Sequence, residues 1–114
     1  MPNFETVGSI NLQTGDRLAW TFYIPPAESV TTKGAIPNGT TVASVVVTAY
    51  DVLENDVTSD LISGTPVVAD NVITVILTYP AINGEGRYKL TFACTLSTGY
   101  TRQFDFERVI AKNK

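Results

Sequence analysis

The chain has 114 residues, of which 44% are hydrophobic and 17% are charged, and its formal net charge at pH 7 is −3. A chain of this length buries about two thirds of its unfolded surface and holds together as one domain without metal or disulfide cross-links. Its 8 Lys and Arg residues are scattered rather than gathered into a phosphate-binding stripe, and no apolar run reaches the roughly 18 residues that span a bilayer. We therefore expect one domain over residues 1–114, with neither nucleic acid nor membrane as a partner.

The N-terminal part of the chain predicts two strands behind a short arm. The first nine residues, MPNFETVGS, lack the charged and apolar regions of a secretory signal, so we expect cytoplasmic synthesis without export by that route. Met1–Thr6 is the expected flexible arm and Val7–Leu12 the first strand. A turn at Gln13–Asp16 leads into the second strand, Arg17–Ile24, whose alternate residues are apolar. The expected inward residues of that strand are Leu18, Trp20, Phe22 and Ile24, with Trp20 as the core anchor.

A long polar loop is expected over Pro25–Thr41. Pro25 and Pro26 end the preceding strand, because neither donates a hydrogen bond to a β ladder, and the residues that follow show no periodicity. Long loops inside compact domains often carry function, so this loop is a candidate partner contact through Pro25, Pro26, Lys33 and Ile36. A plain crossover between two sheets is an equally good interpretation.

Three strands are expected in the middle of the chain, at Thr41–Leu53, Asp60–Val68 and Asn71–Tyr79. The first is apolar on both faces at its three consecutive valines, as in a strand covered by the core on one side and by a loop or subunit on the other. Val45 and Val47 are therefore candidate interface residues.

The clearest pattern is a hairpin over Asn83–Phe106, with a tight turn at Ser97–Gly99. The alternating apolar residues of its first strand are Tyr88, Leu90, Phe92, Cys94 and Leu96. Because side chains alternate between the two faces of a strand, these residues are expected in the core. Cys94 is the only cysteine, so the chain forms no internal disulfide, and a buried, inert thiol is expected.

The second strand of the hairpin closes the domain. Phe104, Phe106 and Ile110 are expected to face inward and Val109 outward, with residues 111–114 as a tail. The charged residues of this strand are Arg102, Asp105, Glu107 and Arg108. They are interpreted as cross-strand pairs and as protection of a sheet edge, not as a site.

Tyr88 opens its strand directly after a glycine-containing corner, as in the tyrosine corner of Greek-key sandwiches. Immunoglobulin domains with a disulfide place a cysteine two residues after this tyrosine, but here Leu90 holds that position. The sequence therefore predicts an all-β fold. We expect an immunoglobulin-like or fibronectin-like Greek-key β-sandwich of about seven antiparallel strands, without a disulfide.

Little in the sequence indicates catalysis. The chain has no histidine, which excludes His-based acid–base catalysis and His-containing zinc sites, and we expect no enzyme and no cofactor. The densest acidic group is Asp51, Glu54, Asp56 and Asp60. These carboxylates are weak calcium candidates, because their spacing does not match an EF-hand loop, and a turn-forming acidic loop is the preferred interpretation. Four tyrosines are candidates for a sugar-stacking surface: Tyr23, Tyr50, Tyr79 and Tyr100.

The C-terminal half, GRYKLTFACTLSTGYTRQFDFERVI, combines a tyrosine after a glycine corner, a Thr-Gly hairpin and an aromatic closing strand. It resembles small immunoglobulin-like proteins encoded among the virion genes of tailed bacteriophages and prophages, and the Asp16, Trp20 and Phe22 segment is also similar. The resemblance covers about two thirds of the chain and leaves Pro25–Thr41 unmatched. It implies a non-enzymatic virion or assembly component and transfers no catalytic residues.

Two functions follow as expectations. The first is a structural or interaction protein of a phage or prophage, forming homo-oligomers or binding virion proteins, with the arm and the tail as docking elements. The alternative is an adhesion or carbohydrate-binding module that uses Pro25–Thr41 and the Asp51–Asp60 loop.

Overall fold

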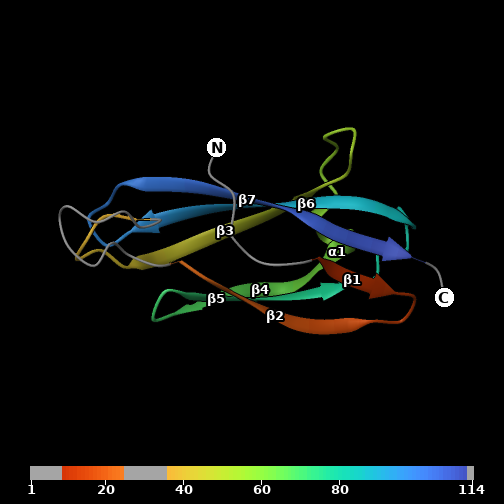
Figure 1. Cartoon of the computed structure of the whole chain (residues 1–114), viewed down its shortest axis with the longest axis horizontal. Helices are drawn as coiled ribbons and strands as arrows, with labels where there is room; N and C mark the ends of the chain where they lie inside the picture. Colours follow the sequence, from red (N-terminus) through yellow and green to blue (C-terminus); the bar gives the residue numbers. More distant parts are fainter. Residues whose placement is uncertain (1–8, 25–35, 113–114) are drawn as a thin grey trace.

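The computed structural model describes residues 9–24 and 36–112, which form seven strands and one short helix (Figure 1). The elements are β1 (Ile10–Gln13), β2 (Arg17–Tyr23), β3 (Val42–Tyr50), α1 (Thr58–Leu61), β4 (Ile62–Ala69), β5 (Val72–Thr78), β6 (Gly86–Leu96) and β7 (Thr101–Lys112). The predicted arm at Met1–Thr6 lies outside the described residues, as do the first eleven residues of the predicted loop and the end of the tail.

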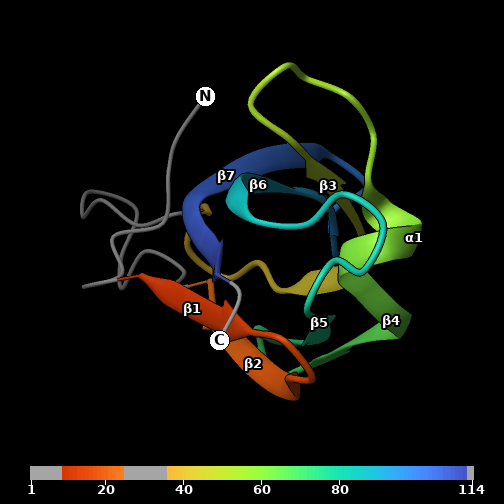
Figure 2. The same ribbon diagram turned by 90° about the vertical axis from the view of Figure 1, so that its right-hand side faces the viewer.

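The strands form two sheets that lie face to face. One sheet has the order β1-β7-β6-β3 and the other β2-β5-β4 (Figures 1 and 2). The prediction of an all-β fold is confirmed. The prediction that all strands are antiparallel is wrong for β1, which pairs parallel with β7 and places Ile10 opposite Val109. Alternation of residues reveals that a strand exists but not the direction of its partner, so this pairing could not be read from the sequence.

Aromatic rings join the two sheets in the core. Phe22 of β2 lies 4.7 Å from Phe92 of β6 and 5.5 Å from Phe106 of β7, measured between ring centroids. Seven predicted core residues are buried: Phe22, Tyr88, Leu90, Phe92, Cys94, Phe104 and Phe106. Trp20 is only half-buried and packs against this core from β2, an edge strand whose outer side no other described strand covers. The prediction of Trp20 as the central anchor is therefore wrong, and Phe22 has that place.

The predicted strand Asp60–Val68 begins too early, because its first two residues belong to α1. The carboxylate of Asp56 accepts hydrogen bonds from the backbone N–H of Thr58 at 2.9 Å and from its hydroxyl at 2.6 Å. These bonds turn the chain immediately before the helix, and Leu61 is buried at its end. β4 then runs from Ile62, and the register of its pairing with β5 shifts between Ser63 and Val67.

An extra residue in β7 reverses the alternation near its end. Tyr88 pairs with Val109, whereas Leu90 pairs with Phe106, so two steps along β6 match three along β7. Beyond this bulge Val109 faces the core and Ile110 is half-buried, which is the opposite of the predicted order. The predicted tail is also wrong at its start, because residues 111 and 112 pair with β1 at the end of β7.

Candidate functional site

One end of the sandwich is held by a corner around Tyr88. Its hydroxyl donates to the carbonyl oxygen of Gly84 at 2.7 Å, and the N–H of Gly84 donates to the carbonyl of Pro80 at 2.8 Å. Gly84 has φ of 74°, a left-handed conformation that glycine adopts without a steric cost. Burial raises the pKa of Tyr88, with a smaller contribution from Asp60, so the hydroxyl remains a hydrogen-bond donor over the ordinary pH range.

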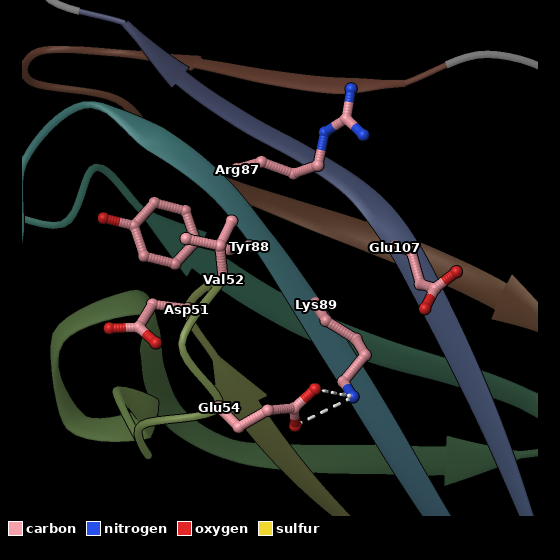
Figure 3. A pocket seen from close by; sticks show the side chains of 7 residues that line it. All are labelled: Asp51, Val52, Glu54, Arg87, Tyr88, Lys89 and Glu107. Atoms are coloured by element: carbon pink, nitrogen blue, oxygen red, sulfur yellow. Dashed lines mark hydrogen bonds and ion pairs between the residues drawn. The ribbon is translucent and has the colours of Figure 1, made fainter.

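A hollow of about 270 Å³ lies beside this corner, between the loop that follows β3 and the strands β6 and β7 (Figure 3). Its lining residues are Asp51, Val52, Glu54, Arg87, Tyr88, Lys89 and Glu107. Sites for drug-sized ligands usually have volumes of about 300–1,000 Å³ and mostly apolar walls. This hollow is smaller and carries charges of both signs, so it does not have the features of a small-molecule site.

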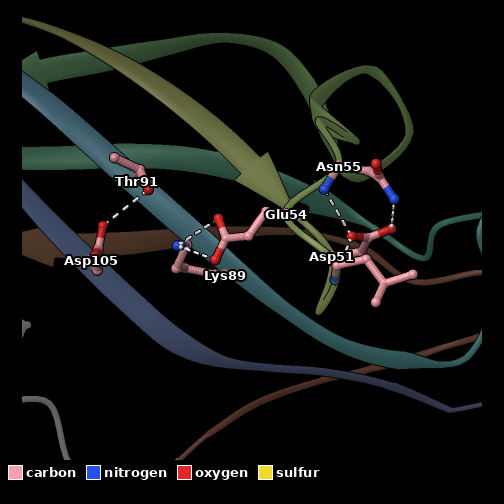
Figure 4. Close-up of polar contacts among 7 residues, drawn as sticks. Asp51, Glu54, Asn55, Lys89, Thr91 and Asp105 are labelled. Atoms are coloured by element: carbon pink, nitrogen blue, oxygen red, sulfur yellow. Dashed lines mark hydrogen bonds and ion pairs between the residues drawn. The ribbon is translucent and has the colours of Figure 1, made fainter.

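Two of the opposite charges in the hollow, Lys89 and Glu54, pair with each other. The Nζ atom of Lys89 lies 3.2 Å from a carboxylate oxygen of Glu54 (Figures 3 and 4), and the same ammonium lies 5.5 Å from the centroid of the Tyr50 ring. The hydrogen bond to Glu54 raises the pKa of Lys89. A lysine held in its charged form is unsuited to act as a base or a nucleophile near neutral pH.

The four calcium candidates do not converge. Asp51 accepts hydrogen bonds from the N–H groups of Leu53 and Asn55, both at 2.9 Å, and so shapes its own loop (Figure 4). Glu54 pairs with Lys89, and Asp56 turns the chain before α1. Within residues 9–24 and 36–112, no three Asp, Glu or Cys side chains are placed to hold one metal ion.

Asp60, the last of the four, ties α1 to the loop between β5 and β6. Its carboxylate accepts hydrogen bonds from the backbone N–H groups of Ile82 and Asn83, at 3.1 and 2.8 Å, and from the Asn83 side-chain amide at 2.8 Å. Partial burial favours the neutral carboxyl, but the hydrogen bonds outweigh it and lower the pKa of Asp60.

Two other acidic groups show the same effect. The pKa of Asp51 is lowered mainly by the backbone N–H of Asn55, and that of Asp56 by the hydroxyl of Thr58. These carboxylates therefore act as turn-forming groups.

Two of the predicted interface residues do not expose their side chains. Ile36 and Val47 are buried in the core, with 2% and 6% of their surface exposed, and Val45 is half-buried. The exposed valine of this run is Val46, at 66%. The Val-Val-Val run is equally apolar in either phase, so only the pairing with β6 determines which valine points outward. Pro25, Pro26 and Lys33 lie outside the described residues.

Two of the four candidate sugar-binding tyrosines have contacts within the domain. Tyr50 lies under Lys89, and Tyr79 packs against the core. Tyr23 is exposed at the end of β2, and Tyr100 is exposed in the turn between β6 and β7.

Two of the charged residues on the last strand, Asp105 and Arg102, make contacts with neighbouring side chains. Asp105 was expected on the outward side but is buried, and its carboxylate accepts a hydrogen bond from the hydroxyl of Thr91 at 2.9 Å (Figure 4). These two residues are direct cross-strand partners of β7 and β6. Arg102 lies 5.7 Å from the ring centroid of Phe104. Glu107 and Arg108 lie at the bulge of β7.

Comparisons of the chain with protein-family models, with curated proteins and with solved structures find no match. Among the described residues, no helix has the length and apolar character to cross a membrane.

Proposed function

We propose that this chain is a non-enzymatic structural or interaction protein that serves as a component of a phage or prophage particle, or of its assembly, and acts through the surfaces of an immunoglobulin-like sandwich. The observation that carries the fold part of this proposal is the hydrogen bond from Tyr88 to Gly84 at the corner between β5 and β6. A tyrosine at the start of the sixth strand, bonded to backbone a few residues upstream, is a feature of Greek-key sandwiches of this type.

The strand order supports the same fold. If β2 to β7 correspond to strands B to G of an immunoglobulin-type domain, the sheet β2-β5-β4 matches B-E-D and the strands β3, β6 and β7 match C, F and G. The first strand then joins the sheet of G, where it is parallel to β7.

The proposal of a structural role is supported by the chemistry of the side chains. The chain has no histidine, Asp51 and Asp60 accept hydrogen bonds from loop backbone, and the one thiol is buried with a pKa raised by burial to about 11. What the described surface offers instead is strand edges and exposed apolar side chains, which are features of protein contacts. The resemblance of the C-terminal half to phage virion proteins gives the context.

The test is made in the cells that carry the gene. Particles purified on a density gradient should contain the tryptic peptide Leu90–Arg102, and deletion of the gene should lower the yield of infectious particles. Complementation with the wild-type chain or with Tyr100→Phe, a change at an exposed position, should restore the yield, whereas Phe92→Asp, which places a charge in the core, should not. Absence of the peptide from particles together with an unchanged yield would contradict the proposal.

A further inference from the structure

β3 has a free side. It is the outer strand of its sheet, and its pairing with β6 is regular from Ser44 to Tyr50. Backbone groups of successive residues point to opposite sides of an antiparallel strand, so every second residue of β3 faces away from β6. Ala49 is one of these, because its carbonyl accepts from Val57 at 2.8 Å and its N–H donates to the hydroxyl of Thr58 at 3.0 Å. By the same alternation, the N–H and C=O groups of Val45 and Val47 also face the free side.

The described residues cover this side at both ends but not in the middle. The N–H of Val42 donates to the side-chain oxygen of Asn71 at 2.8 Å, and beyond Ala49 the edge is covered by residues 55–58. Within the described residues, the outward N–H and C=O groups of Val45 and Val47 have no hydrogen-bond partner. Four backbone groups, the N–H and C=O of Val45 and Val47, are therefore unpaired among the described residues. We call this short stretch of the β3 edge the open window.

This window lacks the devices that usually protect an edge strand. Natural edges carry charges, proline or bulges that prevent pairing with another chain. β4, the neighbouring edge of the other sheet, has Pro66 and a glycine with φ of 73° within its irregular stretch. β3 reads VASVVVTAY, without charge, proline or glycine, and it exposes 66% of Val46 on its outer face.

We propose that two copies of this chain pair through their β3 edges, antiparallel and centred on Val46, to form one continuous sheet. In this register Val45 of one copy faces Val47 of the second copy, and each such pair exchanges two hydrogen bonds, so that all four open groups of each copy are used. The two Val46 side chains then lie directly opposite each other on the same face. The proposal rests on the proposed structural function and names the partner as a second copy.

The position of the window favours a second copy over an unrelated strand. Both copies offer an open window of the same length, and the residues flanking it, Ser44 and Thr48, which become cross-strand partners, are uncharged. A longer foreign strand would gain no further hydrogen bonds, because Asn71 and the 55–58 segment already occupy both ends. The interface is smaller than the roughly 1,200–2,000 Å² of stable complexes, so we expect a dissociation constant on the order of 0.1 mM in free solution.

The register is tested by cysteine cross-linking. Directly opposed residues in a non-hydrogen-bonded antiparallel pair have Cα atoms about 4.5 Å apart, within the range of a disulfide. V46C should therefore form a covalent dimer under mild oxidation at least tenfold faster than V67C, which carries the change at a valine of similar exposure, 60%, on the protected edge β4. Cys94 is buried and does not compete. Equal rates for the two variants, or no dimer from V46C, would overturn the proposal.

A second test measures the oligomeric state of chains without an introduced cysteine. Light scattering after size exclusion, over a concentration series up to about 1 mM, should show wild-type dimers. V46K should remain monomeric, because it sets like charges directly opposite each other, and V67K should behave as wild type. A strictly monomeric wild type, or a V46C cross-link to a different particle protein, would overturn self-pairing and leave the proposed role in a particle standing. Absence of the chain from particles would instead contradict that role, whatever the oligomeric state.

Discussion

The hydroxyl of Tyr88 makes a single hydrogen bond that fixes the turn between the two sheets. Tyr88→Phe removes this donor and leaves the carbonyl of Gly84 without its partner, while the buried ring keeps its packing. A net loss of about 1 kcal/mol in the free energy of unfolding is expected for a hydrogen bond of this kind. Urea denaturation measures it, and Tyr100→Phe is the control, because that ring is exposed at the β6–β7 turn. Equal stability of the two variants would show that the corner bond contributes nothing.

Asp60 links α1 to the loop at residues 81–83, and its contribution depends on pH. Its pKa is lower in the folded chain than the value of about 3.9 in an unfolded one, so its stabilising effect is complete above that value and is lost as the pH falls through the folded pKa. Asp60→Asn should lower the free energy of unfolding at pH 7 by about 1–2 kcal/mol, since it weakens hydrogen bonds made to a charged group.

The comparison that checks this prediction is a series of urea titrations from pH 7 to pH 3. The difference between wild type and Asp60→Asn should shrink on acidification. Glu107→Gln serves as the control, because Glu107 is exposed and the change removes a carboxylate far from the Asp60 loop in sequence. A constant difference at every pH would contradict the assignment of the effect to the Asp60 carboxylate.

Sequence reasoning about single residues succeeded where periodicity and chemistry agree. The alternation over Tyr88 to Leu96 predicted their burial, and the inert Cys94 followed from the same pattern. It failed for Trp20, because the size of a side chain does not reveal whether its strand lies at the edge of a sheet. It also left the acidic residues of the 51–60 segment open between calcium binding and turn formation, because Glu54 pairs with Lys89 and Asp60 with the backbone of residues 82 and 83, which only the fold brings near.

At the scale of elements, the bulge in β7 decides which residues close the core. Val109 is fully buried although the strict alternation from Phe104 and Phe106 predicts Ile110 at that place. One extra residue reverses the faces of all that follow it, and nothing in the local composition of Glu107 and Arg108 marks the position. The same limit applies to β3, where the bulge near Ala43 and the valine run concealed which side chain is exposed.

The bulge predicts which of two neighbouring residues, Val109 or Ile110, contributes more to the free energy of unfolding. Val109→Ala should cost about 1–3 kcal/mol, because it opens a cavity in the core. Ile110→Ala removes more carbon atoms but should cost less, because Ile110 is only half-buried. Thermal and urea unfolding of both variants measure the order. A larger loss for Ile110→Ala would mean that β7 alternates regularly and has no bulge at this position.

For the whole molecule, the class of fold was predictable and the pairing was not. Turn residues and alternation located most of the strands within a few residues of their observed bounds, because each strand is half-buried. The parallel contact of β1 with β7 joins the two ends of the chain, and its partners are separated by about the full length of the domain. Such a contact is set by the closure of the sandwich and leaves no local signal.

The two sheets share one core, and this predicts how the molecule unfolds. Phe22 contributes to the core from one sheet, and Phe92 and Phe106 contribute from the other, so neither sheet keeps a covered apolar face when the other is lost. Unfolding should therefore be a single cooperative transition, as in most domains under about 150 residues. The fluorescence of Trp20, the only tryptophan, reports on the β2 sheet, whereas far-UV circular dichroism reports on all strands.

Both signals should change at the same urea concentration, in the wild type and in Phe92→Leu. That substitution lies in the sheet opposite Trp20, yet it should shift the fluorescence transition as far as the dichroism transition, because the lost packing is shared by the two sheets. Leu18→Ala, at a side chain that is 47% exposed on β2, provides the control and should shift both signals only slightly. Separate midpoints in the wild type, with Trp20 fluorescence changing first, would mean that the three-stranded sheet detaches from a stable four-stranded one. In that case the losses in free energy of unfolding expected for Tyr88→Phe and Val109→Ala would describe the four-stranded sheet alone.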